Sequence, residues 1–239
     1  MSRVVGVDGC KAGWFASWRD NETGVIQSKI YSTAQQLLAS DFKVIAIDIP
    51  IGLSQTGTRS ADQLARRKLG AKKSSSVFSA PLRCCLKATT RLEASELSLE
   101  VCGKGVSAQS FAIYPKILDV DEALQSSDEG VKAKVFEVHP EVCFNELNGG
   151  SSILTRKGDS AGFAERYNLL QSIFDDALFD ESYAKIRDGY YRNQAQDDDI
   201  LDSFVALWSA ERIEKRLARS LPGPPEVDCD TGFSMAIWY

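Results

Sequence analysis

Residues 3–31, RVVGVDGCKAGWFASWRDNETGVIQSKIY, decide the fold of this 239-residue chain. Three apolar runs follow one another here, at residues 3–9, 12–20 and 25–31; the first ends in Asp-Gly, and Asn-Glu-Thr-Gly separates the second from the third. Short apolar runs separated by turn residues are typical of antiparallel strands joined by tight turns. The sequence therefore predicts a three-strand meander.

A helix and a fourth strand follow the meander. Residues 33–40, TAQQLLAS, carry a helical pattern, and residues 43–53, KVIAIDIPIGL, are almost wholly apolar. A strand without polar alternation is typical of the centre of a sheet, where both faces are covered. Because a helical crossover joins parallel strands, we expect residues 43–53 to pair in parallel with the first strand.

The remaining chain predicts further elements around this sheet. Residues 134–147, KVFEVHPEVCFNEL, begin as a strand and become helical after Pro140. We predict helices at 162–174 and about 197–218, a turn-rich connection at 221–232 and a closing strand at 234–239. Residues 54–130 hold weaker helical patterns. We expect one α/β domain over 1–239, with residues 54–130 as a helical insertion.

The composition is that of an ordinary globular protein, 44% hydrophobic and 26% charged, with a formal net charge of −5. No apolar run approaches the ~20 residues that span a bilayer, and the N-terminus enters a strand pattern without a signal-peptide run. We therefore expect a cytoplasmic protein with no membrane segment. Its one histidine, His139, excludes mechanisms that need two.

Positive charge is concentrated in residues 59–87, where eight basic residues accompany one acid, Asp62. The basic residues are Arg59, Arg66, Arg67, Lys68, Lys72, Lys73, Arg83 and Lys87. A solvated helix face usually mixes signs, so this segment is a candidate for contact with phosphate. A plain surface helix is the alternative.

Carboxylates occur where the predicted strands end. Asp8 closes the first strand, Asp48 lies in the apolar run 43–53, and Glu137 precedes His139 and Glu141 in the later strand. Burying a carboxylate is costly unless it is paired or binds a cation. One such acid is readily explained as a structural residue, but three of them favour a shared site.

Four more carboxylates, Asp197, Asp198, Asp199 and Asp202, begin the helix predicted near 197–218. Aspartates at a helix N-terminus cap free N–H groups and complement the helix dipole. Capping does not explain Asp202, which lies a turn inside and shares a helix face with Asp198 or Asp199. Clustered carboxylate oxygens bind Mg²⁺ and Mn²⁺, and two such ions promote phosphodiester cleavage.

The order of these elements resembles the ribonuclease H-like fold, in which a meander, a helix and an acid-bearing central strand precede a late acidic helix. Residues 199–206, DILDSFVA, are similar to the D-x-x-D-A-x-A helix of Holliday-junction resolvases, with Ser203 where Ala is usual. The resemblance implies a mixed five-stranded sheet, an antiparallel meander plus parallel strands, flanked by helices.

Six segments occurring in order resemble one bacterial and archaeal domain family of unknown function, described as a predicted nuclease of the ribonuclease H fold. They are VGVDGCKAGW (5–14), IDIPIGL (47–53), ARRKLGAKKSSSVFSAP (65–81), FEVHPE (136–141), DDILDSFVALW (198–208) and MAIWY (235–239). The resemblance implies a metal-dependent nuclease that cleaves DNA or RNA by a two-metal-ion mechanism with Mg²⁺ or Mn²⁺.

The resemblance also implies the roles of individual acids. The expected metal ligands are Asp8, Asp48, Asp202 and Asp199, with Asp198 as the rival of Asp199. These four ligands and Glu137, placed beside or just behind the metals, are the expected catalytic residues.

Substrate contacts are expected from the basic segment 59–87 and from residues near Glu137. His139 and Glu141 would orient water or substrate, although a partly buried structural imidazole remains the alternative for His139. Phosphate contacts are expected from Arg59, Arg66, Lys72, Lys73 and the 74–76 loop with Ser75.

Two other functions remain open. The chain is also compatible with a scaffold of the same fold that binds nucleic acid or protein without catalysis. Sugar kinases and actin-like ATPases likewise begin with an Asp- and Gly-bearing strand, here residues 5–13, that meets phosphate. They need a second phosphate loop and an adenosine motif, which the 239 residues do not provide.

Overall fold

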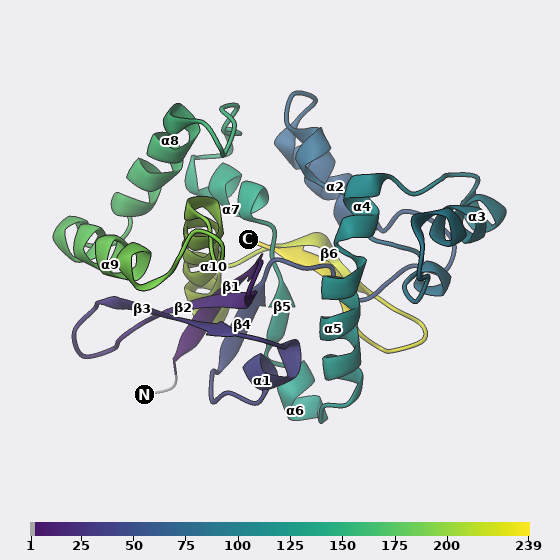
Figure 1. Ribbon diagram of the computed structural model, residues 1–239, viewed down its shortest axis with the longest axis horizontal. Helices are drawn as coiled ribbons and strands as arrows, with labels where there is room; N and C mark the ends of the chain where they lie inside the picture. The colour runs from purple at the N-terminus through teal and green to yellow at the C-terminus, as the bar shows by residue number, and fades with distance from the viewer. Residues whose placement is uncertain (1–2) are drawn as a thin grey trace.

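The computed structural model describes residues 3–239. Its main sheet has the strand order β3–β2–β1–β4–β5 (Figure 1). The strands are β1 (Val4–Cys10), β2 (Gly13–Arg19), β3 (Ile26–Tyr31), β4 (Val44–Ile47) and β5 (Val135–Glu137). β1 and β3 pair antiparallel with β2, whereas β4 pairs in parallel with both β1 and β5. The predicted meander and the mixed five-stranded sheet are therefore confirmed.

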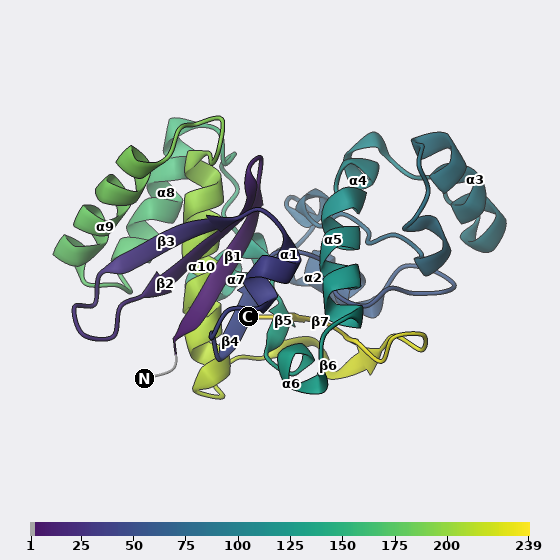
Figure 2. The ribbon, with the colours of Figure 1, turned by 60° about the horizontal axis from the view of Figure 1, so that its bottom comes forward.

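Helices cover both faces of the sheet (Figure 2). The α-helices are α1 (Ala34–Leu38), α2 (Ser60–Leu69), α3 (Arg91–Cys102), α4 (Ala108–Ala112), α5 (Tyr114–Gln125), α6 (Glu129–Lys132), α7 (Pro140–Leu147), α8 (Ser160–Gln171), α9 (Asp176–Gly189) and α10 (Asp197–Glu214). Short 3₁₀ turns are η1 (Ser74–Ser76) and η2 (Arg83–Cys85). Helices α2 to α6 lie between β4 and β5, and the predicted insertion falls within this stretch.

Side-chain alternation along β1 divides the core into two layers. Val5 and Val7 pack with α1 and α5, whereas Val4 packs in the layer that contains α10. β4 alternates in the same way, with Ile47 on the α1 side. Since successive residues of a strand point to opposite faces, Asp8 and Asp48 both belong to the face that α10 covers.

Gly6 allows α10 to lie directly against β1. A Cβ atom at this position would be 1.9 Å from the Leu207 nitrogen and 2.2 Å from the Ser203 carbonyl oxygen. The contact continues on β2, where the Ser17 and Ser203 hydroxyls share a buried hydrogen bond of 2.7 Å. This close approach brings the first turns of α10 to the end of β1.

Two predicted boundaries were wrong. β4 stops at Ile47 instead of residue 53, because Ile51 and Leu53 donate their N–H groups to the side chains of Glu137 and Asp228 instead of a strand. The predicted turn 221–232 is largely a strand, β6 (Ser220–Val227), paired with β7 (Ser234–Trp238). In its sheet β6 has a partner on one side only, so its prolines do not need to donate hydrogen bonds outward.

Across residues 3–239, we find no helix with both the length and the apolar character that crossing a membrane requires.

Candidate functional site

Three acids from separate elements meet at the end of β1. The backbone N–H of Asp48, just beyond β4, donates to the Val7 carbonyl at 2.9 Å, which sets Asp48 beside Asp8. Burial raises the pKa of Asp48, and a side-chain hydrogen bond with Asp8 partly offsets that rise. Asp202, in the second turn of α10, is only 4% exposed. The structure therefore brings together three of the four predicted ligands.

Burial and nearby negative charge raise the pKa values of these three acids. Burial, followed by repulsion from Asp202 and Asp48, raises the pKa of Asp8 well above its ordinary value. Burial likewise raises the pKa of Asp48, and it raises the pKa of Asp202 to about 7 against the opposing effect of Lys157. Desolvation and nearby like charge both favour the protonated form of a carboxyl group. The cluster is thus short of positive charge.

Lys157 supplies one positive charge to the cluster. Its ammonium pairs with Asp202 Oδ2, and Glu141 and Asp8 also raise its pKa above the ordinary value, although burial alone would lower it. Asp202 Oδ1 is buried without a hydrogen-bond partner within residues 3–239. Lys157 was missed in the sequence because TRKGD, residues 155–159, reads as an ordinary surface turn.

The other aspartates of α10 have separate roles. Asp197 pairs with Arg187 and Arg192. The Asp199 carboxylate accepts from the Gln196 N–H at 2.8 Å in a capping box that begins the helix. Burial also raises the pKa of Asp199, and this carboxylate contributes to the raised pKa of Asp8. Asp199 therefore lies at the edge of the acid cluster and is favoured over Asp198 as its fourth member.

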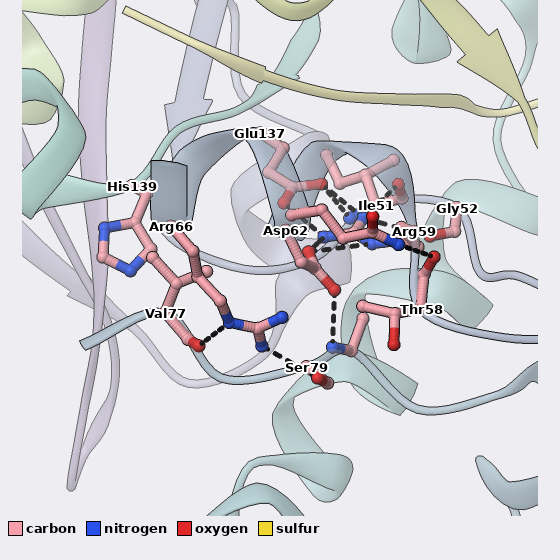
Figure 3. Close-up of polar contacts among 12 residues, drawn as sticks. Ile51, Gly52, Thr58, Arg59, Asp62, Arg66, Val77, Ser79, Glu137 and His139 are labelled. Atoms are coloured by element: carbon pink, nitrogen blue, oxygen red, sulfur yellow. Dashed lines mark hydrogen bonds and ion pairs between the residues drawn. The ribbon is translucent and has the colours of Figure 1, made fainter. Parts of the chain in front are cut away.

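Glu137 points away from the acids. It pairs in register with Ile47, and directly paired residues share a sheet face, so Glu137 lies on the face opposite Asp48. Both of its oxygens accept from Arg59, at 2.8 and 2.7 Å, and one also accepts from Ile51 N–H at 2.7 Å (Figure 3). The prediction of a catalytic role for Glu137 is corrected: it is the buried partner of Arg59.

Arg59 is likewise structural. The residue is 3% exposed, and its guanidinium also bonds Asp62 Oδ1 at 2.6 Å and the carbonyls of Ile51 and Gly52 at 3.1 and 3.2 Å (Figure 3). The prediction that Arg59 contacts phosphate was wrong, because the side chain has almost no surface. It joins the start of α2 to the loop after β4 and to β5.

Arg59→Met should strongly destabilise the fold, because Glu137 and Asp62 would stay buried without their counter-charge. Removing one partner of a buried ion pair costs about 3–5 kcal/mol. Lys43→Met, which removes the exposed pair with Glu214, is the control and should cost about 1 kcal/mol or less. Urea unfolding measures both. Equal losses in the two variants would contradict the structural role.

Arg66 and His139 hold the 76–80 segment. Arg66 donates to the Val77 carbonyl at 3.0 Å and to Ser79 Oγ at 2.8 Å (Figure 3). His139 donates from Nε2 to the Ser76 carbonyl at 3.3 Å. Arg66 thus holds the loop in place, and its predicted phosphate contact stays a prediction, whereas His139 fits the structural alternative.

Acids from other parts of the fold neutralise much of the basic segment. Lys68 pairs with Glu146, Lys73 with Glu141, and Arg83 with Asp121 and Asp228. The exposed basic residues of 59–87 are Arg67, Lys72 and Lys87. Of the predicted phosphate contacts in this segment, Lys72 and Ser75 are exposed, and they stay predictions.

A cleft of about 460 Å³ opens beside the acids. Asp48 and Glu141 line it together with His139 and the basic residues Lys73, Arg156 and Lys157. The Glu141 carboxylate is held by Arg166 at 2.7 Å and by Lys73 at 3.4 Å. This cleft, named here the acid cleft, thus has both carboxylates and basic side chains in its lining.

A family model described as "Protein of unknown function (DUF429)" matches residues 6–227. The chain belongs to the DUF429 family. The predicted membership of a domain family of unknown function is confirmed, and the match contains every residue of the acid cluster. No curated protein matches the chain, and neither does a solved structure.

The acid cluster of this DUF429 protein has the chemistry of a hard-cation site. Asp8, Asp48 and Asp202 present carboxylate oxygens, and the buried Asp202 Oδ1 needs a partner. Such oxygens suit Mg²⁺ or Mn²⁺. As they stand, however, the described residues form no group of three or more His, Cys, Asp or Glu side chains spaced to hold an ion. The residue types therefore suit a divalent cation, but in the described residues the side chains are not close enough together to bind one.

Proposed function

We propose that this DUF429 protein is a Mg²⁺- or Mn²⁺-dependent nuclease of the ribonuclease H-like fold. The observation that carries the proposal is the convergence of the buried Asp8 and Asp202 with the half-buried Asp48, with raised pKa values and one unpartnered oxygen within residues 3–239. The strand order, with β1 between an antiparallel and a parallel neighbour and packed on α10, supports the fold assignment.

Different residues of the chain would bind the metal ions and the phosphate in such a site. Asp8, Asp48 and Asp202 would hold the divalent ions, which supply water activation and charge neutralisation when bound. Lys73 and Arg156 line the acid cleft and are placed to receive phosphate oxygens. Since the Lys157 ammonium already pairs with Asp202, cation binding requires that this pair rearrange.

The test is a panel of labelled single-stranded and duplex DNA and RNA, incubated with Mg²⁺, Mn²⁺ or EDTA. We expect cleavage of at least one substrate with metal, no cleavage in EDTA, and none by Asp8→Asn. Cleavage by Asp8→Asn at the wild-type rate would trace the activity to a contaminant. Absence of cleavage across the panel would count against the proposal.

A binding module without catalysis is the second candidate, and the Lys157–Asp202 pair favours it because an internal ammonium partly satisfies the acids. Calorimetric titration with Mn²⁺ separates the two. Heat of binding that Asp8→Asn abolishes supports the nuclease, and no heat with retained nucleic-acid binding supports the module.

Lys72→Ala combined with Arg156→Ala should weaken nucleic-acid binding and flatten its salt dependence. Each lost phosphate contact removes ~0.7–0.9 from the slope of log K against log salt, so the double variant should lose about 1.5. Anisotropy titrations in EDTA at several salt concentrations measure the slope.

The matched control for this experiment is Lys185→Ala with Lys215→Ala. These exposed lysines lie on α9, which packs on β3, and at the far end of α10. A slope that falls equally in both double variants would show general electrostatics instead of binding at the cleft.

A further inference from the structure

Phe78 is an apolar ring exposed on a firmly held loop. The residue is 41% exposed, although burying an aromatic side chain is normally favourable. The residues on either side have partners of their own: Val77 is buried, and the Ser79 hydroxyl accepts from Arg66.

Hydrogen bonds hold the backbone on both sides of this ring. Arg66 bridges the loop across Phe78, from the Val77 carbonyl to the Ser79 hydroxyl (Figure 3). The Ala80 N–H donates to Asp62 Oδ2 at 3.0 Å, and Asp62 is itself held by the buried Arg59. With the His139 bond to Ser76, four of the five residues 76–80 are anchored, and the fifth presents its side chain to solvent.

The ring stands between two cavities. Phe78 lines the acid cleft and also a second cavity of about 310 Å³, formed between α2 and the α3–α4 region. Arg66 and Lys104 line the second cavity, and within residues 3–239 no Asp or Glu does so. A ligand that occupies both cavities would therefore cross an aromatic ring and meet basic side chains on either side of it. This arrangement suits a polyanion that carries planar aromatic groups.

We propose that Phe78 is a stacking platform for one unpaired nucleobase, whose adjoining phosphate enters the acid cleft and whose next nucleotide enters the second cavity. This inference rests on the proposed function and specifies its substrate: a single strand, or a strand unpaired at the site. Bases stack on exposed aromatic side chains in proteins that bind single strands. Paired bases are already stacked on each other, so a duplex does not present a free face to this ring.

The experiment measures anisotropy of labelled single-stranded and duplex 20-mers, of DNA and RNA, in EDTA so that no cleavage is needed. Wild type should bind the single strand more tightly than the duplex. Phe78→Ala and Phe78→Leu should both weaken single-strand binding about tenfold, within the range for loss of one stacked base. Duplex binding should not change, and Phe78→Trp should retain wild-type affinity.

Phe78→Leu is the decisive control, because it keeps an apolar side chain and removes the aromatic face. Wild-type single-strand affinity in Phe78→Leu overturns the platform, as does equal weakening for duplex and single strand, or failure of wild type to bind any 20-mer. The ring is exposed, so thermal melts of the variants should match wild type. If single-strand binding depends on Phe78 but the protein cleaves no substrate, the stacking proposal stands and the nuclease proposal is wrong. If the protein cleaves single strands and substitution of Phe78 has no effect on binding, the nuclease proposal stands and the stacking proposal is wrong.

Discussion

Asp8→Asn is expected to abolish both nuclease activity and stabilisation by Mn²⁺, while the metal-free protein stays as stable as wild type. Burial and the repulsion of Asp202 and Asp48 raise the pKa of Asp8, because both disfavour the charged carboxylate in the metal-free protein. An asparagine amide has nearly the same shape and carries no charge to repel. Without metal, therefore, little is lost.

In the presence of Mn²⁺, wild type and Asp8→Asn should differ widely in thermal stability and in activity. A cation that binds only the folded state stabilises it by about 2.7 kcal/mol at a hundredfold excess over its dissociation constant. Asp8→Asn removes a charged ligand oxygen, so this gain should vanish. Activity should fall by more than the ~100-fold seen when an outer partner of a metal ligand is lost. Thermal melts in EDTA and in Mn²⁺, with cleavage assays alongside, measure both effects.

Asp8 is a better test than Asp202, because Asp202 carries the ion pair with Lys157 and its loss would destabilise the metal-free protein as well. Asp41→Asn is the control, since Asp41 has a side chain 82% exposed and pairs with Arg3 at the surface. That variant should keep the full response to Mn²⁺. A lower melting temperature for Asp8→Asn in EDTA, together with a wild type that ignores Mn²⁺, would refute the metal site.

Gly6→Ala is expected to cost about 3 kcal/mol or more, at or above the upper end of ordinary overpacking. The added Cβ would lie 1.9 Å from the Leu207 nitrogen and 2.2 Å from the Ser203 oxygen. Both are backbone atoms of α10, so no side-chain rotation relieves the overlap. The whole helix has to move away from β1, and with it Asp202 from Asp8.

Urea unfolding followed by circular dichroism measures this cost. Gly189→Ala, at the end of α9, is the control: its Cβ would meet no atom within 4 Å, so its midpoint should match wild type or rise slightly. A Gly6→Ala midpoint equal to that of wild type would mean that α10 is not seated on β1 as described. Loss of the Mn²⁺ response in a folded Gly6→Ala protein would connect this contact to the acid cluster.

The sequence predicted the sheet because its signals are local. Apolar runs, turn residues and one helical crossover define the meander and the parallel pair of strands. Helical spacing identified Asp202 as a candidate, because this residue lies beyond the first-turn positions at which an aspartate caps the helix. These features depend on neighbours within a few residues, so they are readable without the fold.

Register and charge pairing were decided by tertiary structure. A carboxylate ending a strand looks the same in the sequence whether it faces α10, as Asp48 does, or the opposite layer, as Glu137 does. The partner of Glu137, Arg59, lies 78 residues away, and that of Asp202, Lys157, lies 45 away. The sequence by itself determined the strands of the main sheet and their directions, and its resemblance to known families implied that Asp8, Asp48 and Asp202 belong together. Only the folded chain decided which charges remain free, because whether a charge is neutralised depends on which distant side chain packing brings within a few ångströms.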